Sequence, residues 1–310
     1  MMHLFGRVRL LSLSRQEVAL LAITAVWGGT FLLVHIAMMH SGPMFFVGVR
    51  FLLAGVIGAV VFSRSLRGMT RLELGAGAAI GVMIFFGYGL QTVGLQTINS
   101  STSAFLTALY VPLVPFLQWA VFRKPPSVMA LLGVAFAFVG LLLIAGPDAL
   151  RVGLGPGEIA TLISTIPIAA EIILISVFAG KVDLGRVTVV QLLVCGVLAF
   201  AAMPVVGESV PDFSWAWAGA AIGLGVASCL IQVTMNWAQK SVSPTRATII
   251  YAGEPVWGGI IGRLAGDRLP GIALLGAVFV VLGVLVSELK IQPRRRPKGE
   301  PGGVPGDSDA

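Results

Sequence analysis

The sequence predicts an all-α membrane protein of ten transmembrane helices, arranged as two inverted five-helix repeats. Of its 310 residues, 56% are hydrophobic and 11% are charged, whereas a soluble domain typically has about 25% charged residues. The apolar runs approach about 20 residues, the length that spans a hydrocarbon core about 30 Å thick, and short polar or Gly/Pro-rich breaks separate them. A repeat detectable in the sequence divides the chain into two similar halves.

The polar breaks define the organisation of the chain. Residues 1–16 are expected to be a cytoplasmic N-terminal segment, residues 17–148 and 155–289 the two repeats, and residues 290–310 a basic cytoplasmic tail. The tail is rich in Pro, Gly and charge, a composition typical of disorder. The ten helices are expected near residues 17–39, 44–62, 73–95, 101–122, 128–146, 157–180, 187–206, 215–238, 245–265 and 270–288.

The basic residues predict the orientation in the membrane. With a cytoplasmic N-terminus, the outside loops hold Arg151, Arg263 and Arg268, Arg50 lies within a helix, and the other Lys and Arg residues fall inside. The positive-inside rule predicts this asymmetry, so we expect a multi-pass protein of the cell inner membrane with both termini cytoplasmic. The net charge of +7 is spread over short clusters, which does not suggest the continuous basic face of a nucleic-acid-binding protein.

A shift of 143 residues aligns the two halves. Gln96 falls on Gln239, Ser100 on Ser243 and Pro112 on Pro255. Each half has an odd number of helices, so the second enters the membrane in the opposite orientation, as in many secondary transporters.

The equivalent prolines Pro112 and Pro255 predict two interrupted helices, because proline removes a backbone donor and clashes with the preceding turn. Paired interruptions of this kind point to a binding site in transporters. The alternative is that proline is simply commoner in membrane helices than in soluble ones.

Two acidic residues lie near the middle of predicted helices, where an ionised carboxylate costs about 2.5 kcal/mol or more. Glu171, one turn after Pro167, is expected to bind a proton or a cationic substrate amine, or else to be a neutral acid bonded between helices. Glu254 shares a helix face with Tyr251 and Trp257. It either binds the solute between these aromatic rings or caps the interrupted helix.

Other polar and aromatic residues add candidates for solute binding. Arg50, placed near the outer end of the second helix, either attracts a substrate carboxylate, pairs with an acid such as Glu171, or snorkels to the interface. Amides and tyrosines at helical spacing are expected to bond the solute, and a tryptophan either forms a cavity wall or packs in the core. These residues are Trp27, Tyr88, Gln91, Tyr110, Gln232 and Asn236.

Four motifs resemble the drug/metabolite transporter superfamily, and in particular proteins built from two EamA-type repeats. They are WGGTF from Trp27, RFLLAG from Arg50, STSAFLTALYVPLVP from Ser101 and SPTRATIIYAGEPVWGGIIG from Ser243. The resemblance implies that helices 1–4 and 6–9 surround a central cavity, with helices 5 and 10 set aside. The Gly-Glu pair that usually ends the fourth and ninth helices is replaced by Arg123-Lys124 and Gly266-Asp267.

The expected function is secondary active transport, as an exporter of small metabolites such as amino acids or related amphipathic compounds. The solute would pass through a central cavity by alternating access, and proton coupling is one option. A membrane scaffold or receptor is the first alternative, although the expected loops are short. An intramembrane enzyme is the second, although the sequence has no GxSxG or HExxH motif. Neither a cofactor, a metal nor a catalytic residue is expected, and the sequence does not indicate an oligomeric state.

Overall fold

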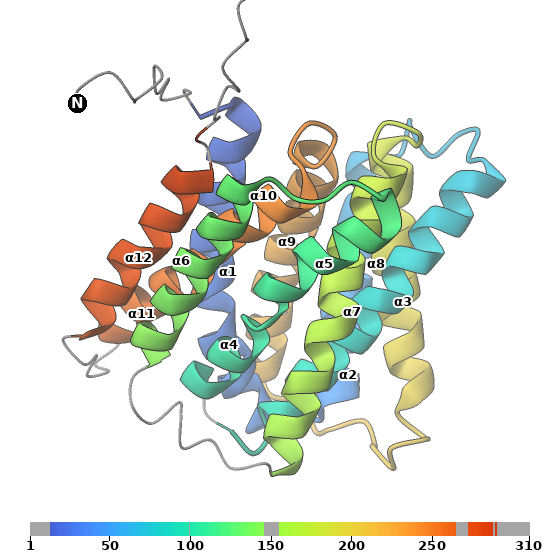
Figure 1. Cartoon of the computed structure of the whole chain (residues 1–310). Coiled ribbons are helices and arrows are strands. Elements are labelled where there is room, and N and C mark those ends of the chain that lie inside the picture. The colour runs from blue at the N-terminus through green and yellow to red at the C-terminus, as the bar shows by residue number, and fades with distance from the viewer. Residues whose placement is uncertain (1–12, 99, 146–154, 265–271, 288, 290–310) are drawn as a thin grey trace, which may run out of the picture.

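The computed structural model describes residues 13–98, 100–145, 155–264, 272–287 and 289, and all regular secondary structure in these ranges is helical (Figure 1). The predicted tail, Arg151, Arg268 and Gly266-Asp267 lie outside the described residues. The first half contains α1 (Arg15–Met38), α2 (Pro43–Val61), α3 (Arg71–Gly94), α4 (Ser100–Thr107), α5 (Tyr110–Phe122) and α6 (Val128–Ala145). The second half contains α7 (Pro156–Phe178), α8 (Leu184–Ala202), α9 (Trp215–Ala238), α10 (Pro244–Tyr251), α11 (Glu254–Leu264) and α12 (Ile272–Ser287).

The helix count follows the prediction once the two interrupted helices are recognised. α4 and α5 together form one crossing, α10 and α11 form another, and the described segments then give the ten expected crossings. In the described part of the chain, seven helices are long and apolar enough to span a membrane, and α6 and α12 are shorter apolar helices. The all-α membrane fold predicted from the sequence is confirmed.

Local sequence signals set several helix starts. Ser14 with Glu17, and Thr70 with Glu73, form capping boxes at the first turns of α1 and α3, so side chains satisfy backbone donors that the helix leaves unpaired. Proline occupies the first position of α2, α7 and α10, where its missing N–H costs nothing.

The two halves pack against each other in a pattern that repeats when the halves are exchanged. The 143-residue shift makes α1 equivalent to α7, α2 to α8 and α3 to α9. α3 lies against α7 and α8, and equivalently α9 lies against α1 and α2. α5 packs against α7, and α11 packs against α1. Most helices therefore contact the opposite half, and the bundle is one interleaved unit.

The helices α6 and α12 lie side by side at one edge of the bundle (Figure 1). A Cβ on Gly133 would lie 2.7 Å from the carbonyl oxygen of Gly283, and a Cβ on Gly140 would lie 2.6 Å from that of Gly276. Only glycine permits so close an approach of two backbones. Because residue numbers rise along one helix as they fall along the other, the pair is antiparallel.

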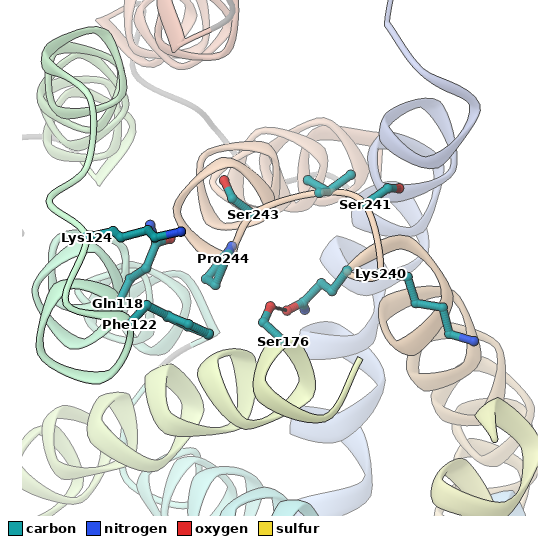
Figure 2. A pocket seen from close by; sticks show the side chains of 10 residues that line it. Gln118, Phe122, Lys124, Ser176, Lys240, Ser241, Ser243 and Pro244 are labelled. Carbon is teal, nitrogen blue, oxygen red and sulfur yellow. Dashed lines mark hydrogen bonds between the residues drawn. The ribbon is translucent and has the colours of Figure 1, made fainter. Parts of the chain in front are cut away.

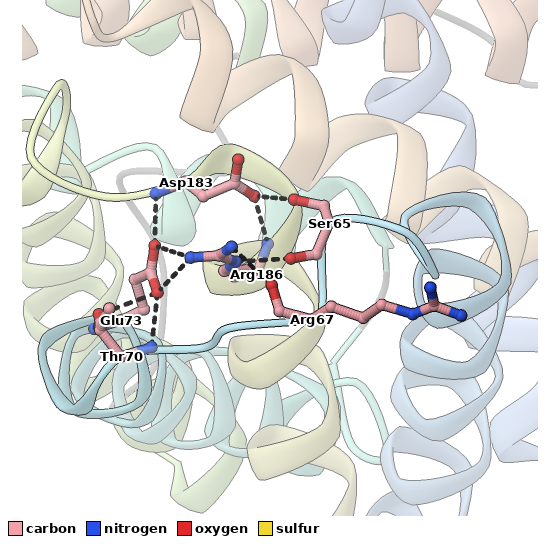
Figure 3. A network of polar contacts seen from close by, with 6 residues as sticks. All are labelled: Ser65, Arg67, Thr70, Glu73, Asp183 and Arg186. Carbon is pink, nitrogen blue, oxygen red and sulfur yellow. Dashed lines mark hydrogen bonds and ion pairs between the residues drawn. The ribbon is translucent and has the colours of Figure 1, made fainter.

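We call the end of the bundle where α1 begins the N end. Here the α2–α3 loop is joined to the start of α8 by a polar network, the edge network, made of Ser65, Thr70, Glu73, Asp183 and Arg186 (Figure 3). Arg186 Nη1 lies 3.0 Å from Glu73 Oε2, and its Nε donates to the Ser65 carbonyl oxygen at 2.6 Å. At the opposite end, the Glu208 carboxylate accepts hydrogen bonds from the backbone N–H groups of Met44 and Phe45 at 2.9 and 3.0 Å. Polar contacts thus tie α3 to the second half at the N end and tie α2 to the second half at the opposite end.

Candidate functional site

Two helices are interrupted near the middle of the bundle. α4 and α5 are separated at residues 108–109, and α10 and α11 at residues 252–253. Pro112 lies in the first turn of α5 and Pro255 in the first turn of α11, so neither gives a backbone N–H to the preceding turn. The interruptions lie at equivalent positions of the two halves, within one residue of the 143-residue shift.

Six buried polar side chains from six helical segments gather at these interruptions, and we call them the central cluster. Each is 5% exposed or less. All three tyrosines of the chain belong to it. Its members are Arg50 on α2, Tyr88 on α3, Tyr110 on α5, Glu171 on α7, Tyr251 on α10 and Glu254 on α11.

The central cluster is one electrostatic unit. Glu171 and Glu254 both lie within electrostatic range of Tyr88 and of Tyr110, and Glu254 lies within range of Arg50. The structure therefore brings six of the sequence-predicted residues to one place.

Arg50 lies deeper than the sequence suggested. It is the eighth residue of α2, counted from Pro43, and it is 3% exposed, so it does not snorkel to an interface. Its Nε donates to Ser228 Oγ at 2.7 Å, and its guanidinium carbon lies 5.1 Å from the ring centroids of both Phe51 and Tyr88. Its Nη2 is buried and has no hydrogen-bond partner among the described residues.

Glu171 does not pair with Arg50. Its Oε1 accepts a hydrogen bond from Gln232 Nε2 at 2.8 Å, and Gln232 Oε1 accepts one from Gln191 Nε2 at 2.6 Å. Asn236 Nδ2 in turn lies 3.2 Å from Gln191 Oε1 and 3.0 Å from Thr188 Oγ1. These contacts form a chain of buried amides. Asn236 donates to Gln191, Gln191 to Gln232, and Gln232 to Glu171.

A second set of polar contacts runs from the central cluster to the N end. The hydroxyl oxygen of Tyr251 lies 3.2 Å from Gln239 Nε2, and Gln239 Oε1 accepts a hydrogen bond from Ser176 Oγ at 2.8 Å. Trp27 packs edge-to-face on Tyr251, with ring centroids 5.7 Å apart. Trp27 is therefore buried beside the cluster.

Two further predicted residues, Trp257 and Gln91, are not members of the central cluster. Trp257 is 39% exposed, whereas Glu254 and Tyr251 are buried, so the three residues do not share one buried face. Gln91 Nε2 donates to Thr107 Oγ1 at 2.9 Å and so links α3 to the end of α4. Gln91 thus ties an interrupted helix to its neighbour.

A pocket of about 320 Å³ opens at the N end, between α5, α7 and the α9–α10 loop (Figure 2). The Ser176–Gln239 hydrogen bond lies at its edge, and on another side Gln118 Oε1 accepts hydrogen bonds from the N–H and the hydroxyl of Thr245 at 3.0 and 2.9 Å. Its lining residues are Gln118, Phe122, Lys124, Ser176, Gln239, Lys240, Ser241, Val242, Ser243 and Pro244.

The residues predicted from the sequence do not include Gln191, Thr188, Gln239 or Gln118. A signal was available for Gln191, because an amide within an apolar run meets the criterion that selected Gln232, and Thr188 precedes it by one turn. Gln239 and Gln118 stand near helix ends, where a polar residue is ordinary. Only the folded arrangement relates them to Tyr251 and Thr245.

Comparison with known proteins places this architecture among transporters. Residues 15–146 and 155–289 each match the EamA-like transporter family. An "uncharacterized transporter" of Archaeoglobus fulgidus is 26% identical over 286 residues, which cover 89% of this chain and 86% of that protein. The "uncharacterized inner membrane transporter YedA" of Escherichia coli K12 is 27% identical over 277 residues, covering 86% of this chain and 87% of YedA. A solved crystal structure, 17% identical and covering 89% of this chain and 98% of its own, superimposes with a TM-score of 0.72, which shows the same fold.

Proposed function

Given that this chain belongs to the EamA-like transporter family, and is thus a multi-pass membrane transporter and not an enzyme, we propose that it is a secondary active exporter of small polar metabolites. The solute binds at the central cluster and crosses by alternating access. One observation carries the proposal, namely that a cation and two acids are buried together where two helices are interrupted. Ionisable groups at membrane depth are costly and are typical of substrate or ion pathways.

The charges in the central cluster favour a substrate that carries both polar and apolar parts. Arg50 suits an anionic group, whereas Glu171 and Glu254 suit an amine or a proton. The rings of Trp27, Tyr88 and Tyr110 provide apolar surface beside these charges. Amino acids and related amphipathic compounds combine these features.

The N end is proposed to face the cytoplasm. Arg64, Arg67, Lys124, Lys181 and Lys240 all lie at this end, as the positive-inside rule requires of a cytoplasmic face. The pocket in Figure 2 then opens to the cytoplasm and serves as the entry for outward transport.

The inverted repeat is supported by the contact between α6 and α12. Gly133 is equivalent to Gly276 and Gly140 to Gly283 under the 143-residue shift, yet Gly133 contacts Gly283 and Gly140 contacts Gly276. A two-fold axis perpendicular to both helices produces this exchange. The equivalent rings of Phe136 and Phe279 meet each other, with centroids 5.8 Å apart. Such an axis lies in the membrane plane.

Proton coupling through Glu171 or Glu254 supplies the energy in this proposal. Both acids belong to the second half, Glu171 on α7 and Glu254 on α11, and each of these helices packs against the first half, α7 against α3 and α11 against α1. A substrate amine that replaces a proton at one of these acids would link transport to the proton gradient.

Counterflow in proteoliposomes tests the proposed function. Vesicles containing the purified protein and loaded with an unlabelled solute are given the labelled solute outside, across a panel of amino acids, nucleobases and cationic drugs. Saturable accumulation of one class, enhanced by an imposed pH gradient, is the expected result. Absence of accumulation for every member, by protein that is folded and inserted, would contradict transport and favour a scaffold.

A further inference from the structure

We propose that Arg50 binds a carboxylate of the substrate, so that the protein selects solutes carrying this anionic group. The inference rests on the proposed function, because it specifies a chemical feature of what the central cluster transports. One nitrogen of this guanidinium group, Nη2, is buried and lacks a hydrogen-bond partner among the described residues.

The hydrogen-bonding capacity of Arg50 is incompletely used. Arginine has five N–H donors and no acceptor. Here Nε donates to Ser228 Oγ at 2.7 Å, while Nη2 is buried and has no hydrogen-bond partner in the part of the chain that the structure describes. A buried charged donor left unpaired is costly. A ligand that accepts a hydrogen bond from Nη2 would remove this cost when it binds.

The guanidinium group is oriented before any ligand binds. Ser228 on α9 fixes the Nε edge, and the rings of Phe51 and Tyr88 both lie 5.1 Å from the guanidinium carbon. A group held from three helices loses little freedom when it binds. Its planar fork matches the two oxygens of a carboxylate, which a compact ammonium does not.

Within the described ranges, no side chain forms an ion pair with Arg50. In the described ranges the ion pairs join Arg186 to Glu73 and Arg246 to Glu17. Glu171 uses Oε1 to accept the bond from Gln232. Glu254 acts on Arg50 electrostatically but forms no ion pair with it within the described residues.

The anion must be a soluble one that uses the transport path. Arg50 is 3% exposed and is enclosed by α2, α3 and α9, so a lipid headgroup has no access to it. A carboxylate on Arg50 places the rest of a small solute among Tyr88, Glu254 and the helix interruptions. An α-amino acid would then present its ammonium group to an acid of the cluster.

The test compares leucine and phenylalanine with leucinamide and phenylalaninamide, which keep the amine and the side chain but lack the carboxylate. In proteoliposome counterflow, the wild type is expected to favour each acid over its amide by about tenfold or more. Arg50→Gln should lose this preference through weaker binding of the acids, and Arg50→Lys should lose most of it because lysine lacks the fork. Arg64→Gln, which removes an exposed arginine from the α2–α3 loop, is the matched control and should keep the preference.

A second variant tests the orientation of the guanidinium group while keeping its charge. Ser228→Ala removes the partner of Nε and should weaken acid binding by a smaller factor than Arg50→Gln does. Arg50→Lys and Ser228→Ala also carry the test if Arg50→Gln fails to fold, which the elution profile and thermal unfolding of each variant will show.

The outcomes separate this inference from the proposed function. Equal transport of acids and amides by the wild type, or an unchanged preference in Arg50→Gln and Arg50→Lys, would overturn the role of Arg50 and leave transport standing. No counterflow of any solute in the wider panel would contradict the proposed function, and the inference with it.

Discussion

Arg186 and Arg50 show two different uses of the same side chain. Arg186 lies in the edge network with its side chain 21% exposed, and its donors reach Glu73 and the carbonyl oxygens of Ser65 and Arg67 (Figure 3). Arg50 is buried in the central cluster, and its Nη2 has no hydrogen-bond partner within the described ranges. Each side-chain nitrogen of the partly exposed Arg186 has a hydrogen-bond partner, whereas the buried Arg50 has a nitrogen without a partner among the described residues.

This contrast separates a structural charge from a functional one. A charged group that only stabilises the fold should have its partners supplied by the chain, as in the edge network. A charged group reserved for a ligand keeps bonding capacity free at a cost in stability. The following predictions test whether the edge network affects stability alone and the central cluster transport alone.

The largest expected effect is that of Glu171→Gln on transport. Glutamine retains an oxygen that accepts the hydrogen bond from Gln232, so the fold should persist, but it cannot bind or release a proton. We expect the pH dependence of counterflow to disappear and the rate to fall by about tenfold or more, with thermal unfolding nearly unchanged. The control is Glu158→Gln, in the first turn of the same helix. If Glu171→Gln keeps the pH-dependent flux of the wild type, Glu171 has no role in coupling.

A smaller effect, on stability, is expected for Glu73→Gln. The change removes the ion pair with Arg186 and weakens the hydrogen bond from the Asp183 N–H. We expect a loss of about 1 to 2 kcal/mol of unfolding free energy, since hydrogen bonds to charged groups are worth about that much and partial exposure weakens them. Thermal unfolding measures the loss, and counterflow per folded molecule should not change. Arg71→Gln, an exposed charge two residues earlier, is the control. A large loss of transport by folded Glu73→Gln would break the distinction between the two regions.

The smallest effect is expected at Asp183, at the start of α8. Burial raises the pKa of Asp183, but hydrogen bonds from Ser65 Oγ and the Arg186 N–H outweigh this and hold the pKa below its ordinary value. A lowered folded-state pKa gives stability that is complete above the unfolded value of about 3.9 and is lost as the pH falls through the folded-state pKa. Ser65→Ala should therefore reduce stability by about 1 kcal/mol at neutral pH.

The pH dependence of Ser65→Ala provides its own check. The gap in unfolding temperature between wild type and variant should narrow as the pH falls below about 4, because a protonated Asp183 bonds Ser65 more weakly. A gap that stays constant down to acid pH would mean that Ser65 acts through packing and not through the Asp183 carboxylate.

The fold was predictable because the membrane imposes strong rules on sequence. Apolar length defines each crossing, and the shift that superimposes Pro112 on Pro255 located both interrupted helices. The central cluster was partly predictable for the same reason, since Glu171 and Glu254 are conspicuous in apolar runs. Their burial and mutual arrangement follow from packing between the two halves.

The rest depended on contacts that the sequence does not encode locally. Arg50 looked interfacial from its position in the run, but Ser228 lies 178 residues away in the chain and holds it at the centre. The edge network likewise joins residues more than 100 positions apart, such as Glu73 and Arg186. A side chain's partners across the two halves cannot be inferred from the spacing of residues on one helix.

The glycine contacts between α6 and α12 restrict how the two halves can move. The carbonyl oxygens of Gly276 and Gly283 face the backbones of Gly140 and Gly133, respectively. If one helix slid along the other by a single residue, a side chain would be placed against these oxygens. Rotation about the contact keeps glycine against carbonyl. Translation is therefore opposed at this edge of the bundle while tilting is permitted, so α6 and α12 form a pivot about which the rest of the molecule can turn.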